Sequence, residues 1–152
     1  MSSTGPISRK LMPGRITVRA TSSVTRVSPA VARPAEILYA GFSLGVMAAQ
    51  SLAQTRPGAR GAILYSAAMP ASEFGGSWPE GVPLQIHMMD ADPWGEEDRP
   101  VAEALVEEVA DAQLFLYPGS GHLFADESLG DYDEQAADLL QERTLAFLER
   151  VG

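Results

Sequence analysis

The chain has 152 residues, of which 45% are hydrophobic and 20% charged, which is enough material for one domain with a single core. Its formal net charge of −9 disfavours a nucleic-acid partner, because the phosphates would be repelled. The absence of cysteine excludes a disulfide framework, a thiolate zinc site and a cysteine nucleophile, and it fits a cytoplasmic location. No apolar run is long enough to span a bilayer, so we expect no membrane partner.

The charge is divided unevenly along the chain. Residues 1–35 hold six basic residues and no acidic one, giving +6, whereas residues 36–152 hold five arginines against all 20 acidic residues, giving −15. The first part is rich in Ser, Thr, Arg and Pro without sustained periodicity, which suits a disordered basic tail, a transit peptide or sequence foreign to the domain. We therefore predict a basic segment, disordered or atypical, over 1–35 and a folded domain over 36–152.

Strands and helices alternate from residue 36 onward. In chain order we predict a strand over 36–42, a helix over 43–55, a strand over 61–66, an irregular stretch over 69–81, a strand over 82–89, a helix opened by Asp98 as its N-cap, a strand over 112–117, and a helix from about 131–133 to the end. This alternation predicts an α/β fold with a mainly parallel sheet and helices on both faces.

The turn between the first strand and helix has the pattern Gly-x-Ser-x-Gly over residues 41–45. This is the pattern of a nucleophile elbow, in which Ser43 would stand on a sharp strand-to-helix turn. Such a turn leaves almost no room for a side chain two residues before or after the serine, and Gly41 and Gly45 meet that need. The next helix would direct its first amides beside Ser43, so the Leu44 N–H is a candidate oxyanion donor.

Two further loops carry an acid and a histidine at the carboxyl ends of the third and fourth predicted strands, where parallel sheets gather their working residues. Asp90 and Asp92 lie in the first of these loops and His122 in the second. The order serine, aspartate, histidine would allow a triad in which His122 is the base for Ser43 and a buried carboxylate orients the imidazole.

Alternatives stay open at each of these positions. Asp92 is favoured as the acid because it lies further into its loop, beside Pro93, and Asp90 is the alternative. His122 is also compatible with an ordinary surface histidine in a glycine-rich loop. His87 lies within a predicted strand and is expected to be structural rather than the base.

Aromatic residues next to these positions are candidates for the wall of an apolar substrate pocket: Phe42, Trp94 and Phe124. Packing beneath loops explains Trp94 and Phe124 equally well. The sequence offers no basis for a metal, a nucleotide or a lipid anchor, so we expect no cofactor.

Four segments together resemble the dienelactone hydrolase family of α/β-hydrolases: residues 41–45, 82–87, 90–94 and 117–124. The resemblance covers roughly residues 36–150. It implies hydrolysis of a small ester or lactone without a metal or organic cofactor. It also implies Ser43 as nucleophile, Asp92 as acid and His122 as base.

Two features depart from the pattern of that family. The family's characteristic nucleophile is cysteine, whereas Ser43 needs general-base help at the moment of attack, which favours a general esterase over action on a dienelactone. Family members also have several strands and helices before the elbow, so we expect this chain to be truncated to the carboxyl-terminal part of the fold. Such a truncation would remove the second oxyanion donor and leave a strand edge exposed for pairing into a homodimer.

The sequence thus predicts a serine hydrolase of the dienelactone hydrolase type, acting on a small ester or lactone through Ser43, Asp92 and His122. The alternative is a non-catalytic remnant of the same fold that persists as a binding or self-associating module.

Overall fold

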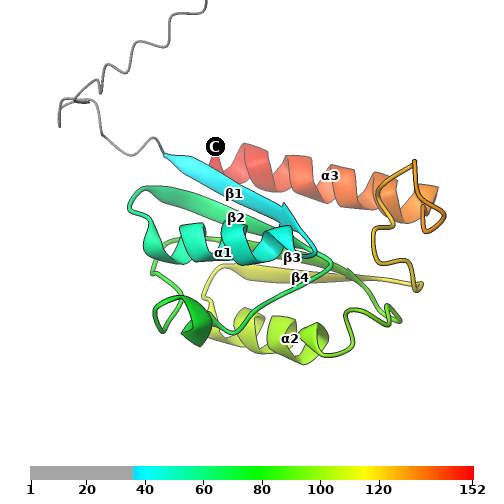
Figure 1. Cartoon of the computed structure of the whole chain (residues 1–152). Coiled ribbons are helices and arrows are strands. Elements are labelled where there is room, and N and C mark those ends of the chain that lie inside the picture. Colours follow the sequence, from blue (N-terminus) through cyan, green and yellow to red (C-terminus); the bar gives the residue numbers. More distant parts are fainter. Residues whose placement is uncertain (1–35) are drawn as a thin grey trace, which may run out of the picture. The chain divides into compact units, whose positions relative to one another are not determined.

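The computed structural model describes residues 36–152, so the predicted basic segment over 1–35 lies outside the described residues. The described part contains one four-stranded sheet in the order β1-β2-β3-β4 (Figure 1). The strands are β1 (Ile37–Phe42), β2 (Ala59–Tyr65), β3 (Leu84–Met89) and β4 (Ala112–Tyr117). All three neighbouring pairs are parallel, which confirms the predicted parallel sheet.

Helices cover both faces of this sheet, which confirms the predicted α/β fold. They are α1 (Gly45–Thr55), α2 (Asp98–Glu108) and α3 (Glu134–Val151), with a short 3₁₀ helix, η2 (Ala71–Phe74), inside the stretch predicted to be irregular. Helices α1 and α2 pack on one face and α3 on the other (Figure 1). Within residues 36–152, no helix combines the length and the apolar character needed to cross a membrane.

The two hydrophobic cores follow from the alternation of side chains along the strands. In β2, Leu64 belongs to the core beneath α1 and α2, whereas its neighbours Ile63 and Tyr65 belong to the core beneath α3. All six residues of β3 are buried, as expected for a parallel strand with a helix layer on each side.

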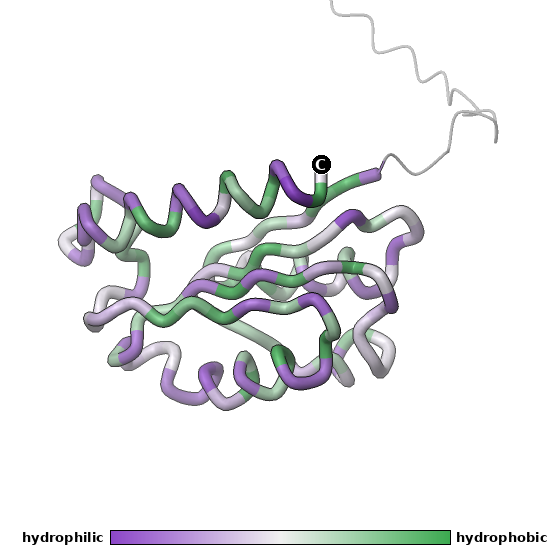
Figure 2. The backbone as a smooth tube through the Cα atoms, turned by 180° about the vertical axis from the view of Figure 1, so that it is seen from behind, coloured by the Kyte–Doolittle hydropathy of each residue, from purple (hydrophilic) through white to green (hydrophobic). Residues whose placement is uncertain are grey.

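Helix α3 is amphipathic, and its hydropathy alternates along its length (Figure 2). Ala136, Leu140 and Phe147 are its buried residues. The Asp133 carboxylate accepts a hydrogen bond from the Ala136 N–H at 2.9 Å and so caps the helix. The predicted start near residues 131–133 is therefore close to the observed one.

The start of α2 differs from the prediction. Glu97 occupies the N-cap position and makes no side-chain capping bond, while Asp98 is the first helical residue. The predicted cap was wrong because the Asp98 side chain lines a cavity formed with distant parts of the chain.

His87 is buried in the core beneath α3, where its ring nitrogens contact the Tyr117 hydroxyl at 2.7 Å and the Gln85 side-chain oxygen at 2.8 Å. Burial lowers the pKa of His87 to about 3, and the nearby charge of Arg143 acts in the same direction. The imidazole is therefore neutral in the folded protein at neutral pH and serves packing and internal hydrogen bonding.

We predict that His87 makes the folded domain less stable in acid. The unfolded chain takes up a proton on this histidine below about pH 6.5, whereas the folded chain does so only near pH 3, so stability falls as the pH drops through this window. The expected loss between pH 7.5 and pH 5 is about 2 kcal/mol. Urea denaturation at both pH values measures it, and His87→Gln should lack this contribution; equal pH dependence in both proteins would contradict it.

Candidate active site

Ser43 stands in the tight turn that joins β1 to α1. Its φ is 48°, a left-handed conformation that is uncommon for a residue with a side chain. The Ser43 N–H donates to the Tyr65 carbonyl at 2.8 Å, which extends the pairing of β1 with β2 into the turn. This hydrogen bond holds Ser43 at the carboxyl end of the sheet.

The two glycines that flank Ser43 have different roles. A Cβ on Gly41 would overlap the carbonyl of Gly45 and lie 2.9 Å from the nitrogen of Val46. At Gly45, a Cβ would meet no described atom within 4 Å apart from its chain neighbours and the backbone of its own helix. The expectation that both positions must be free of a side chain is right for Gly41 and wrong for Gly45, because only Gly41 packs directly against the helix backbone.

Three predicted residues from separate loops form a hydrogen-bonded row. Ser43 Oγ lies 2.7 Å from His122 Nε2, and His122 Nδ1 lies 2.6 Å from Asp92 Oδ2. The Asp92 side chain is 1% exposed, so its carboxylate is withdrawn from water. A buried carboxylate in contact with an imidazole can fix the orientation of the ring and stabilise its protonated form.

The structure distinguishes between the two acids considered from the sequence. Besides His122, Asp92 binds the N–H of Trp94 through Oδ1 at 2.9 Å. Asp90 instead accepts a hydrogen bond from the Gly119 N–H at 3.0 Å and thus links the loops after β3 and β4. Asp92 is the acid that contacts His122, and Asp90 braces the loop that carries it.

Ser66 also supports the row, although the sequence did not single it out. It follows β2 directly, is buried, and has a φ of 62°. Its N–H donates to the His87 carbonyl at 2.8 Å, and its hydroxyl donates to the carbonyl of His122. Ser66 therefore fixes the backbone of His122, and its place at the carboxyl end of a strand is the signal that could have identified it.

Leu44 lies between Ser43 and the first residue of α1. The residue is 80% exposed. Among the hydrogen bonds of residues 36–152, none is donated by its backbone N–H. That N–H is at the amino end of a helix, where the backbone dipoles favour negative charge.

A cavity of about 240 Å³ opens beside this row. Its lining includes Ser43, His122, Leu44, Met47, Met69, Trp94 and Asp98. The indole of Trp94 is tilted against the His122 ring, with 6.2 Å between the ring centroids. Trp94 therefore lies at the cavity, as predicted for a pocket residue.

The other two aromatic candidates lie elsewhere. Phe42 stacks on Tyr65 with 4.1 Å between ring centroids, on the face of the sheet that α3 covers. Phe124 is buried in the same core and packs against Tyr117. Neither lines the cavity beside Ser43. Phe124 is buried in the core beneath α3, which corrects its expected pocket role. Phe42 is exposed and lines a separate cavity of about 570 Å³, so its role as a pocket residue stays a prediction.

Asp98 contributes a carboxyl group to the cavity. Burial raises the pKa of Asp98, while the Ala68 N–H and His122 act in the opposite direction and favour its charged form. Glu97 and Asp92 add to the upward shift of the pKa through like-charge repulsion. Among the described residues that line this cavity, Asp98 is the only acidic one.

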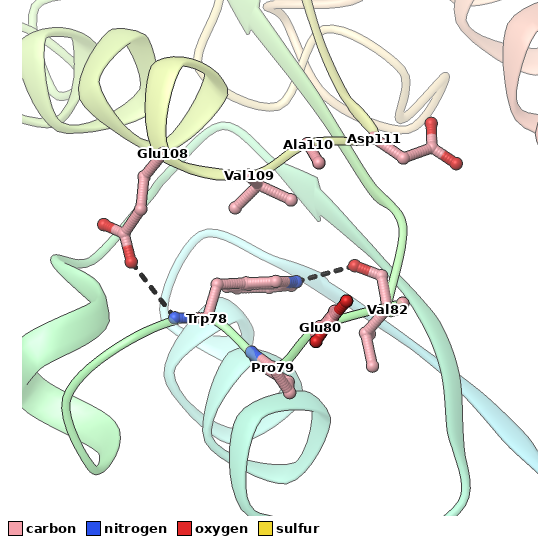
Figure 3. A pocket seen from close by; sticks show the side chains of 9 residues that line it. Trp78, Pro79, Glu80, Val82, Glu108, Val109, Ala110 and Asp111 are labelled. Carbon is pink, nitrogen blue, oxygen red and sulfur yellow. Dashed lines mark hydrogen bonds between the residues drawn. The ribbon is translucent and has the colours of Figure 1, made fainter.

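A different cavity, of about 290 Å³, lies at the amino ends of β3 and β4 (Figure 3). The Trp78 indole fills one wall and donates to the Val82 carbonyl at 2.7 Å, and the Trp78 N–H binds Glu108 at 3.1 Å. None of the row Ser43, His122 and Asp92 lines this cavity. Nor do residues 36–152 bring three potential metal ligands together anywhere.

We predict that the two elbow glycines respond oppositely to alanine. Gly41→Ala forces a methyl group against the α1 backbone and should lower the free energy of unfolding by about 1–3 kcal/mol. Gly45→Ala is the matched control: it should leave stability unchanged or raise it by up to about 1 kcal/mol, because alanine favours a helix over glycine. Chemical denaturation of both variants tests this, and equal losses would contradict the steric argument.

Comparison with known proteins agrees with this architecture. The family model described as the dienelactone hydrolase family matches residues 5–152. A crystal structure described as a "putative dienelactone hydrolase" from Klebsiella pneumoniae subsp. pneumoniae MGH 78578 is similar, with a TM-score of 0.56 and 22% sequence identity. The match covers 72% of this chain and 50% of that one, so this chain spans about half of its length. No curated protein matched. The chain belongs to the dienelactone hydrolase family.

Proposed function

We propose that the protein is a serine hydrolase that cleaves a small ester or lactone. The single observation that carries the proposal is the continuous row from Ser43 Oγ to His122 at 2.7 Å and on to Asp92 at 2.6 Å. Membership of a hydrolase family supports the reaction class. The ester or lactone specificity and the assignment of roles are our inference from the side chains.

In this proposal His122 transfers the proton. Its Nε2 removes the hydroxyl proton of Ser43 as Oγ attacks the substrate carbonyl carbon. Asp92 holds the other ring nitrogen and stabilises the imidazolium that forms. The tetrahedral intermediate then expels the alcohol, which takes the proton from His122, and leaves an acyl group on Ser43. Water, deprotonated by His122, releases the acid and restores the serine.

The Leu44 N–H is the proposed donor to the oxyanion. It is adjacent to Ser43 and stands at the start of α1, so negative charge on the carbonyl oxygen would be stabilised there. A serine hydroxyl, unlike a thiolate, depends on its base, and this favours an ordinary ester over a dienelactone as substrate. Every step uses the chain's own side chains and water, so we propose no cofactor.

The alternative function is that of a non-catalytic, self-associating module. One observation favours it: β1 is an edge strand of the sheet formed by residues 36–152, and its Ala40 and Phe42 are exposed. An unpaired strand edge can accept a strand from a second copy. A homodimer through this edge, like the cytoplasmic location, stays a prediction.

Hydrolysis of p-nitrophenyl acetate tests the proposed function. Wild type should turn over, and Ser43→Ala and His122→Gln should each lower kcat/KM by about 10³-fold or more, because the nucleophile and the base act as one unit. The exposed Ser77 supplies the matched control, and Ser77→Ala should retain wild-type activity.

Two results would overturn this proposal. One is a folded wild-type protein with no turnover. The other is activity that survives Ser43→Ala, which would place the nucleophile elsewhere. Size-exclusion chromatography of the same preparations would show whether an inactive protein self-associates.

A further inference from the structure

The wall of the cavity beside Ser43 carries two groups that the proposed triad does not use. Asp98 supplies a half-buried carboxyl group, and Trp94, a residue that is 78% exposed, supplies an indole. Both line the cavity together with Ser43 and His122. A substrate bound for attack by Ser43 would therefore meet both groups.

Trp94 is held in place at this cavity. Its backbone N–H donates to the Asp92 carboxylate at 2.9 Å, and its ring is tilted against His122. The face of an indole attracts cations, most strongly when the cation has shed its water. The position of Trp94 suits the recognition of a cationic group near the scissile bond.

The charge of the residues that line the cavity also suits a cationic group. Of the side chains that line the cavity in the described part of the chain, none is a lysine or an arginine. Arg99, the neighbour of Asp98, binds the Glu103 carboxylate at 3.0 Å and the Asp90 carbonyl at 3.3 Å. Burial raises the pKa of Asp98, because the charged carboxylate is less well solvated in the cavity than in water. A bound cation would offset this loss of solvation.

The electrostatic field of residues 36–152 as a whole also favours a cation at the cavity. Residues 36–152 carry five arginines and 20 acidic residues, a net charge of −15. Such a field concentrates cations near the surface and repels anions, to an extent that falls with added salt.

Building on the proposed function, we propose that this cavity selects esters whose acyl group carries a positive charge, with Asp98 and Trp94 as the residues that recognise the cation. The reaction is the hydrolysis described above: the ester bond breaks, Ser43 is acylated, and water releases the cationic acid. A substrate with a carboxylate at the same place would be disfavoured by Asp98.

Three p-nitrophenyl esters with the same leaving group test this. Their acyl groups are 4-(trimethylammonio)butanoyl, its neutral isostere 5,5-dimethylhexanoyl, and the anionic hydrogen glutaryl. For wild type at low salt, kcat/KM for the cationic ester should exceed that of the neutral isostere by about tenfold, and the anionic ester should be the poorest substrate. Added salt should narrow these differences.

The variants separate local recognition from the general field. Asp98→Asn should bring the ratio of cationic to neutral ester close to one, and Trp94→Leu should lower it. Glu107→Gln removes the same amount of charge from an exposed position of α2 outside the cavity, and it should keep the wild-type ratio.

The outcomes distinguish this inference from the proposed function. If wild type hydrolyses neither these esters nor p-nitrophenyl acetate, the proposed function fails. If it hydrolyses p-nitrophenyl acetate but rejects the cationic ester, or treats the cationic and neutral esters alike, only the cation selectivity is overturned. If Asp98→Asn keeps the wild-type ratio of kcat/KM for the cationic and neutral esters, the cation selectivity is also overturned.

Discussion

The hydrogen bond between Asp92 and His122 is the contact on which the candidate site depends. The Asp92 side chain is only 1% exposed. Burying a carboxylate costs free energy unless it has a charged or hydrogen-bonding partner. His122 and the Trp94 N–H are the partners of Asp92. The loops after β3 and β4 must therefore come together, and they do so because parallel pairing places the carboxyl ends of these strands at one edge of the sheet.

The strain in the site is balanced by the sheet beside it. Ser43 and Ser66 both adopt positive φ immediately after a strand, a conformation that costs free energy for a residue with a side chain. Each donates its N–H to a carbonyl of the neighbouring strand: Ser43 donates to Tyr65, and Ser66 donates to His87. These bonds continue the strand pairing by one step, so the rigidity of the sheet positions both the proposed nucleophile and the support for its base.

The sequence predicted what depends on order and local pattern, and it missed what depends on packing. Alternating elements and the order Ser43, Asp92, His122 were sufficient for the parallel fold and the row, because a parallel sheet brings successive strand ends together. Phe124 was misplaced because closeness to His122 in sequence does not tell which side of a loop faces the core. Asp98 was taken for a helix cap, since its contact with a cavity formed by α1 and the loop after β2 has no local signature.

The most direct test of the account is the rate at which a fluorophosphonate labels Ser43, followed by peptide mass spectrometry. We expect wild type to be labelled at Ser43 alone. Asp92→Asn should slow labelling by about 10⁴-fold, because the imidazole loses the partner that fixes its tautomer. Asp90→Asn changes the neighbouring acid but keeps an oxygen that can accept from the Gly119 N–H, so it should label at the wild-type rate. Equal rates in all three proteins, or no labelling of the folded wild type, would contradict the proposed triad.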